Sequence, residues 1–171
     1  MMIRCIIDTN VVASANKAII TNPSDDIYKY PELLKNCIEL IYEIMNKGIY
    51  VVLDQDNEII NEYNRIKTDN DYPGVGNEFI KWLYINQWRF PDSERVKLHK
   101  TEDSYKEFPQ EMDEIDVDPD DKKFFAVSYM HPSKPDIFQA VDTAWWKWVD
   151  AASKCGITIR FLDEQYMIDH N

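Results

Sequence analysis

Four acidic residues, far apart along the chain, are the side chains best placed to do chemistry. Asp8 and Asp142 each directly follow a short apolar run that is typical of a buried strand. Because the carboxyl ends of neighbouring parallel strands meet at one edge of a sheet, these two carboxylates are expected to emerge together. Glu62 lies within an expected helix and Asp121 near the start of another, and both helices can pack beside these strands. The pattern predicts a cluster of four carboxylates.

Clustered carboxylates repel one another, so such a site needs something that offsets its charge. A hard divalent cation is the usual solution, and both Mg²⁺ and Mn²⁺ prefer oxygen ligands. Each residue also has a purely structural interpretation. Asp8 and Asp142 would be helix N-caps, Asp121 would complement a helix dipole, and Glu62 would be a solvated helix residue. For each residue alone, the structural role explains its type and position at least as well as metal binding does. The occurrence of all four together favours a metal site.

Apolar periodicity locates the elements that must position these residues. Strands are expected at residues 2–7, 49–53, 136–141 and 157–162, with a weak edge strand at 95–99. Helices are expected at residues 31–47, 56–67, 77–88, 119–129 and 143–154, and the acidic stretch 102–118 is expected to be a solvated loop. The alternation predicts an α/β fold, a three-layer α/β/α sandwich with a central, mostly parallel sheet. The length of 171 residues suits a single domain, residues 1–171.

Composition restricts the environment and the partners. The formal net charge of −12 disfavours nucleic acid as a partner, unless bound cations or a basic partner protein offset it. No apolar run approaches the roughly 20 residues of a membrane span, and no signal peptide is expected. Cys5, Cys37 and Cys155 lie far apart in apolar patterns, so they are expected to be buried free thiols in a reducing cytoplasm.

Five stretches of the chain resemble, in order, the motifs of PIN-domain nucleases. The chain opens with an apolar strand and then Asp-Thr-Asn, which is residues 8–10 of IIDTNVVAS. The segment LDQDNEIINEYNRI resembles the second-helix motif and places its acidic residue at Glu62. DVDPDDKKFFAVS resembles the third motif, with Asp121 as its acidic residue, and IFQAVDTAWW resembles the fourth, a strand that ends in Asp142. GITIRFLDEQYM resembles the closing strand and turn.

The resemblance implies a PIN-like fold and a metal-dependent endoribonuclease that hydrolyses phosphodiester bonds. Asp8, Glu62, Asp121 and Asp142 would bind Mg²⁺ or Mn²⁺, which would make a water molecule more acidic and stabilise charge on the phosphate. Thr9 or Asn10 would orient one of these carboxylates. The substrate would be single-stranded or structured RNA. A role as the toxin of a toxin–antitoxin pair, an antitoxin protein as partner and a homodimer are further implications.

The chain departs from the family's pattern at several positions. Ala140 occupies a position where many relatives have Thr, and three tryptophans occupy the helix after Asp142. These departures bear on substrate contacts more than on metal binding, and no substrate-binding residue is assigned. Within the motifs Asp118 and Asp120 remain alternatives to Asp121, as Glu58 does to Glu62.

Two other functions make different demands on the sequence. A non-catalytic PIN-like module that binds protein or RNA would fit the acidic charge. A metal-dependent phosphatase of the haloacid-dehalogenase type would need a second Asp two residues after Asp8, where Asn10 stands.

The sequence also suggests roles for tryptophans, cationic residues and histidines outside the acidic positions. Trp82, Trp145 and Trp148 share the helical spacing of core residues, whereas Trp146 is the best candidate for an exposed aromatic residue. Cationic side chains near the motifs could contact phosphates or pair with local acids; they are Arg65, Lys122, Lys123 and Lys147. His99, His131 and His170 show no ligand spacing.

Overall fold

A parallel four-stranded sheet forms the centre of the molecule. The computed structural model describes residues 3–17, 26–66 and 73–171. Its main sheet has the order β2-β1-β5-β6, and every neighbouring pair is parallel. The strands are β1 (Arg4–Ile7), β2 (Tyr50–Val51), β5 (Asp136–Gln139) and β6 (Ile159–Phe161). The prediction of a mixed α/β fold with a parallel central sheet is therefore confirmed.

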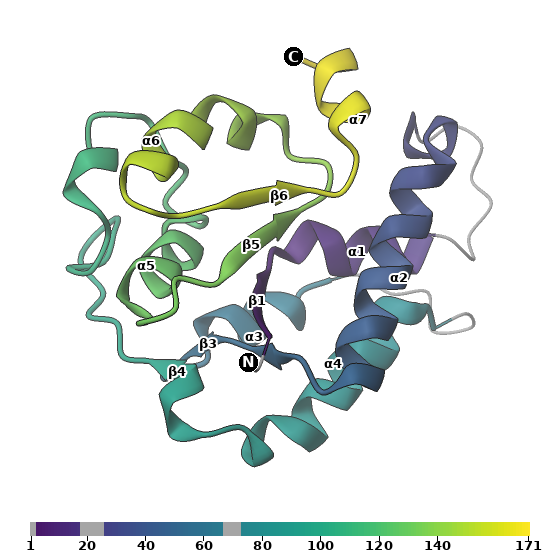
Figure 1. Cartoon of the computed structure of the whole chain (residues 1–171), viewed down its shortest axis with the longest axis horizontal. Coiled ribbons are helices and arrows are strands. Elements are labelled where there is room, and N and C mark those ends of the chain that lie inside the picture. Colours follow the sequence, from purple (N-terminus) through teal and green to yellow (C-terminus); the bar gives the residue numbers. More distant parts are fainter. Residues whose placement is uncertain (1–2, 18–25, 67–72) are drawn as a thin grey trace.

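Helices lie on both sides of this sheet (Figure 1). The helices are α1 (Thr9–Lys17), α2 (Pro31–Lys47), α3 (Glu58–Tyr63), α4 (Val75–Asn86), α5 (Lys122–Met130), α6 (Val149–Lys154) and α7 (Glu164–Asp169). α1, α2 and α4 pack against one another on one side, whereas α5 packs against β5 from the other. Short 3-10 helices also occur; they are η1 (Asp26–Lys29), η2 (Gln87–Arg89), η3 (Asp92–Glu94), η4 (Gln110–Met112) and η5 (Thr143–Trp148). The arrangement is compatible with a three-layer sandwich.

The segment expected to be one strand at residues 49–53 is divided between two sheets. β2 pairs with β1, but β3 (Leu53–Asp54) pairs in parallel with β4 (Arg95–Val96) in a separate two-stranded ladder. Val52 links the two: its N–H donates to the carbonyl of Cys5 over 2.9 Å. The prediction of a single strand was wrong, because apolar periodicity marks burial but not the choice of pairing partner.

Helix α2 illustrates how local sequence fixes the two ends of an element. Pro31 occupies the first turn, where its missing N–H costs nothing, and Gly48 ends the helix in the left-handed conformation at φ 66°. Five apolar side chains at helical spacing are buried, namely Leu33, Leu34, Cys37, Ile41 and Ile44. The prediction of a helix over residues 31–47 is confirmed.

The acidic stretch 102–118 is only partly the solvated loop that was expected. Tyr105, Phe108, Met112 and Val117 are buried. The ring of Phe108 packs edge-on against that of Phe125 on α5, with centroids 6.5 Å apart. Apolar residues at intervals of three to five positions thus attach the segment to the core, while most of its carboxylates face water.

Several element boundaries differ from those expected. The helix expected at 143–154 begins as the 3-10 helix η5 and continues as α6. The helix expected from residue 119 begins at Lys122, and β5 ends at Gln139 rather than at residue 141. The helix expected at 56–67 is the shorter α3, and residue 67 lies outside the described residues.

Two glycines allow α1 and α4 to approach closely. A Cβ atom on Gly76 would lie 2.1 Å from the carbonyl oxygen of Val12, and one on Gly74 would lie 2.5 Å from the Cα atom of Asn16. This contact fixes the helix that begins directly after Asp8. Among the described residues, no helix combines the length and apolar character needed to cross a bilayer.

Candidate functional site

The two strand-end aspartates lie at the same edge of the main sheet, as predicted. Asp8 directly follows β1, and its N–H donates to the carbonyl of Phe138 over 3.0 Å, which continues the pairing of β1 with β5. Asp142 lies three residues beyond the end of β5. Both carboxylates therefore emerge from the carboxyl ends of adjacent central strands.

Asp8 is almost completely buried, with 1% of its surface exposed. Its Oδ2 atom accepts a hydrogen bond of 2.8 Å from the N–H of Asn10. Burial raises the pKa of Asp8 to about 7, against the lowering effect of the Asn10 N–H, and repulsion from Glu62 and Asp142 adds to the increase. Asp8 is therefore the central residue of this site: it is buried, and two other carboxylates repel its charge.

Asp121 lies at the start of α5 and joins the same cluster. The indole Nε1 of Trp145 donates a hydrogen bond of 3.1 Å to Oδ2 of Asp121. Burial raises the pKa of Asp121 to about 8, and the negative charges of Asp8 and Asp142 raise it further. Asp8, Asp121 and Asp142 thus interact with one another, although they come from three distant parts of the chain.

Asp142 serves as a helix cap as well as a member of the cluster. Its Oδ1 atom accepts a hydrogen bond of 3.0 Å from the N–H of Ala144, at the start of η5. Asp8 accepts the Asn10 N–H in the same way. The structural and functional interpretations are compatible, because a carboxylate has two oxygens and one of them satisfies the local N–H.

Glu62 lies beside the cluster, on the side of Asp8. Its charge raises the pKa of Asp8. The hydroxyl of Thr9 donates a hydrogen bond of 2.5 Å to Oε1 of Glu62, and the ammonium group of Lys123 forms an ion pair with Oε2. Lys123 is buried, with 4% of its surface exposed. The Glu62 carboxylate is therefore already held by two partners, one of them the Thr9 that the resemblance singles out.

The alternative acidic residues occupy less enclosed positions. Asp118 and Asp120 are exposed, whereas Asp121 is half-buried; Asp118 is nevertheless close enough to raise the pKa of Asp121. Glu58 forms an ion pair with Lys100 over 3.2 Å. The structure brings Asp121 and Glu62, rather than these alternatives, next to Asp8.

Gln139 is a site residue that the sequence interpretation missed. It is fully buried at the end of β5, and its Oε1 atom accepts hydrogen bonds from the N–H groups of Ala140 (2.7 Å) and Asp142 (3.4 Å). Its Nε2 atom has no hydrogen-bond partner of ordinary geometry. The side chain is still close enough to Asp8 to lower the pKa of that carboxyl. A polar residue at a buried strand position was the one available signal.

Two polar pockets, each of about 370 Å³, adjoin the acidic cluster. The first is lined by Glu58, Asn61, Glu62, Arg65, Lys100, Glu102, Asp103, Ser104, Tyr105, Pro119, Asp120 and Lys123. The second is lined by Asp116, Asp118, Pro119, Asp121, Asp142, Ala144 and Trp148. Pro119 lines both, so the segment that leads into α5 borders each of them. Arg65 is exposed in the first pocket and forms no ion pair with any described residue.

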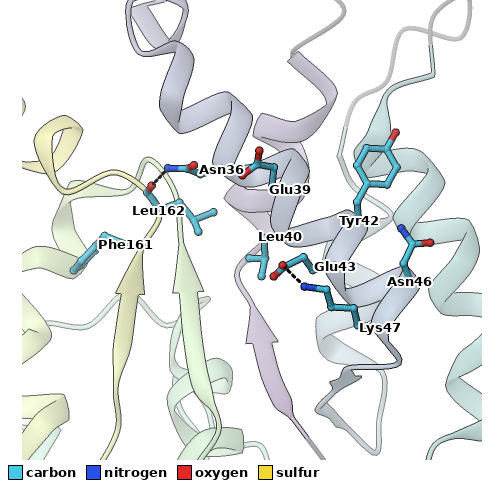
Figure 2. Close-up of a pocket in the computed structure, with 9 residues that line it drawn as sticks. All are labelled: Asn36, Glu39, Leu40, Tyr42, Glu43, Asn46, Lys47, Phe161 and Leu162. Carbon is cyan, nitrogen blue, oxygen red and sulfur yellow. Dashed lines mark hydrogen bonds and ion pairs between the residues drawn. The ribbon is translucent and has the colours of Figure 1, made fainter.

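A groove of about 570 Å³ lies elsewhere, between α2 and the end of β6 (Figure 2). Leu40 of α2 and Leu162, after β6, face each other across it, and Asn36 donates a hydrogen bond of 2.7 Å to the carbonyl of Leu162. None of the four predicted carboxylates lines this groove.

Other predicted residues fall largely where expected. Trp145 and Trp148 are buried, and Trp146 is partly exposed, with its ring 5.2 Å from that of Phe161. Trp88, which carried no prediction, is 75% exposed. Each histidine lies beside a carboxylate, in the pairs His99–Glu107, His131–Glu94 and His170–Asp26. The three cysteines are free and buried, as predicted.

The acidic cluster does not form a finished coordination sphere. Within residues 3–17, 26–66 and 73–171, no three His, Cys, Asp or Glu side chains are arranged so that they could hold a metal ion as they stand. What the cluster offers is a set of oxygen donors under mutual repulsion. Comparison of the chain with protein-family models, curated proteins and solved structures found no significant match.

Proposed function

We propose that this protein is a PIN-like, metal-dependent endoribonuclease that hydrolyses phosphodiester bonds in RNA. One observation carries the proposal: Asp8, Asp121 and Asp142 converge at the carboxyl edge of β1 and β5, where ligand sites of parallel α/β sheets lie. The order of the acidic motifs along the chain supports the PIN-like assignment.

The chemistry of the donor set fits Mg²⁺ or Mn²⁺. Hard cations take carboxylate oxygens, and burial with like-charge repulsion gives Asp8 and Asp121 pKa values of about 7 and 8. A bound cation lowers the pKa of such carboxyl groups, so they release their protons when it binds. Asp8, Asp121 and Asp142 would hold the cation, with Glu62 bound directly or through water.

When bound, a divalent cation would lower the pKa of a water molecule and offset the charge that develops on the phosphate. The protein's own residues would position these groups. The N–H of Asn10 binds one oxygen of Asp8, and the N–H of Ala144 binds one oxygen of Asp142. The indole N–H of Trp145 binds one oxygen of Asp121. Each carboxylate keeps its other oxygen for a ligand.

Glu62 must exchange partners to join such a site. In the structure Lys123 neutralises it, and Thr9 donates to it. Release of this ion pair would give the cluster its fourth carboxylate and would free the Lys123 ammonium beside the pocket that also contains Arg65. That pocket is our candidate for the substrate's phosphate groups.

The test is cleavage of end-labelled single-stranded RNA by purified protein with Mg²⁺, with Mn²⁺ and with EDTA. We expect cleavage that requires the cation and is lost in Asp8→Asn. The matched control is Asp150→Asn, which removes an exposed carboxylate on α6. Cleavage that survives Asp8→Asn would contradict the assignment of the site.

A non-catalytic PIN-like binding module is the alternative proposal. The net charge of −12 favours it, and so does the Lys123–Glu62 ion pair, because a carboxylate that already has a cationic partner is less available to a metal ion. Absence of cleavage of RNA and DNA by well-folded protein in the presence of either cation would support this alternative. Binding of RNA or of a basic protein without turnover would then define its role.

A further inference from the structure

Gln139 and Asp8 are neighbours across the two central strands. The register of β1 and β5 pairs Ile7 with Phe138, so Asp8 and Gln139 follow as the next pair. In parallel strands such partners place their side chains on the same face of the sheet. Both residues are buried, with 1% and 0% exposure. The amide of Gln139 therefore shares a water-poor compartment with the Asp8 carboxylate.

The backbone fixes which end of this amide faces the cluster. The N–H groups of Ala140 and Asp142 can only donate, so the atom that they contact is Oε1. The Nε2 atom consequently points away from this turn. It is buried and lacks a hydrogen-bond partner of ordinary geometry, and the strand register places the Asp8 carboxylate beside it.

A buried amide donor without a partner destabilises the fold, because it gives up its hydrogen bonds to water and gains none in return. An apolar residue would avoid that cost in a strand of this kind. The donor is explained if its purpose is to act on the carboxylate beside it.

We propose that Gln139 is a positioning residue that joins the Asp8 carboxylate to the turn leading into Asp142, and so sets the two carboxylates relative to each other for cation binding. This inference rests on the proposed function. One end of the amide accepts from the backbone N–H of Asp142, and the strand register places the residue beside Asp8, so a single side chain lies between the two halves of the site.

The experiment measures Mn²⁺ binding by isothermal titration calorimetry, with thermal unfolding of the cation-free protein as a second readout. Gln139→Met keeps the volume of the side chain and removes both ends of the amide. We expect Mn²⁺ affinity to fall by about 10–100-fold, as is usual when a group that orients a metal ligand is lost. The matched control is Gln87→Met, which removes another buried amide, one that accepts from Arg95.

The outcomes separate this inference from the proposed function. If wild-type protein binds no Mn²⁺, the proposed function fails and the inference fails with it. If wild-type protein binds Mn²⁺ and Gln139→Met binds it equally well, only the role of Gln139 is overturned. A merely structural role would lower the melting temperature of both Met variants and leave Mn²⁺ affinity unchanged. Gln139→Asn, which keeps an amide but shortens its reach, replaces Gln139→Met if the latter does not fold; we expect at least a tenfold loss of affinity there too.

Discussion

The indole Nε1 of Trp145 donates to Oδ2 of Asp121 over 3.1 Å, and this hydrogen bond joins η5 to the start of α5. Trp145 is fully buried among aromatic rings, with its ring centroid 4.7 Å from that of Phe125. The side chain thus serves the core and the acidic cluster at once. Its place in the sequence indicated only the first role.

Trp145→Phe should destabilise the protein more at high pH than at low pH. The indole N–H favours the ionised form of Asp121, whose pKa is about 8, so its loss matters most above that pH. We expect a cost of about 1.5–3 kcal/mol at pH 9 from the lost bond to a charged group, and a smaller cost at pH 6. Urea unfolding at the two pH values measures it. Trp148→Phe, which alters a buried ring without a bond to the cluster, should cost the same at both.

The cation-free protein should lose stability as the pH rises from about 4 to about 8, through the contributions of Asp8 and Asp121. Both carboxyls have folded-state pKa values above the unfolded value, so the folded protein binds more protons in this window. Asp8→Asn should therefore gain stability relative to wild type as the pH rises, on the order of 2–4 kcal/mol at pH 8. Guanidinium unfolding with EDTA present provides the measurement. A difference between the two proteins that stays constant with pH would contradict the burial argument.

Lys123→Met should make folding depend on the cation. The substitution leaves Glu62 without its positive partner, which should cost up to about 3 kcal/mol in EDTA. Saturating Mn²⁺ should restore more stability to this variant than to wild type, because Glu62 is then available to the site. Melting temperatures with and without Mn²⁺ test this expectation. Lys100→Met removes an exposed ion pair with Glu58 and should change little in either condition.

Arg65→Met should weaken RNA binding and leave the chemical step largely intact. Arg65 is exposed in the pocket beside Glu62 and forms no ion pair within the described part of the chain. Loss of one phosphate contact should raise KM for RNA by roughly 3–10-fold with kcat nearly unchanged, and should reduce the salt dependence of binding. Arg89→Met, at a position that lines neither polar pocket, is the control. An equal effect of both variants would mean that general charge, rather than this pocket, attracts RNA.

Gly76→Ala should destabilise the fold irrespective of any function. The added methyl group would lie 2.1 Å from the carbonyl oxygen of Val12, so α1 and α4 would have to separate. We expect a loss of about 3 kcal/mol or more in urea unfolding. Gly48→Ala supplies the comparison: no atom lies within 4 Å of the new methyl group, and the φ of 66° should cost only about 1–2 kcal/mol. Equal losses would contradict the close helix contact.

The sequence was most informative where one residue type has one physical consequence. An apolar run that ends in an aspartate located Asp8 and Asp142 at one sheet edge, and Gly48 marked the end of α2. It was less informative where the outcome depends on three-dimensional partners. The ion pair of Glu62 with Lys123 and the Gln139 amide beside Asp8 join segments whose proximity no local pattern encodes.

The acidic stretch 102–118 is a second case in which the sequence pattern did not predict the three-dimensional contacts. Residues 102–118 have the charge of a solvated segment, yet Phe108 and Met112 are buried. The prediction of a solvated loop followed from the average composition of the stretch. In the folded protein, the contacts of a few buried apolar side chains determine where the loop lies.

The chain passes from the main sheet to the β3–β4 ladder at Val52. The residues of the acidic cluster are therefore positioned by two separate sheets. β3 ends at Asp54, whose carboxylate accepts the N–H groups of Glu58 and Ile59 over 2.8 and 2.9 Å and so anchors the helix that carries Glu62. Asp8 and Asp142 belong instead to the β1–β5 ladder. A shear between the two ladders would change the spacing from Glu62 to Asp8 and leave that from Asp8 to Asp142 intact, so Glu62 can be adjusted without disturbing the Asp8–Asp142 pair.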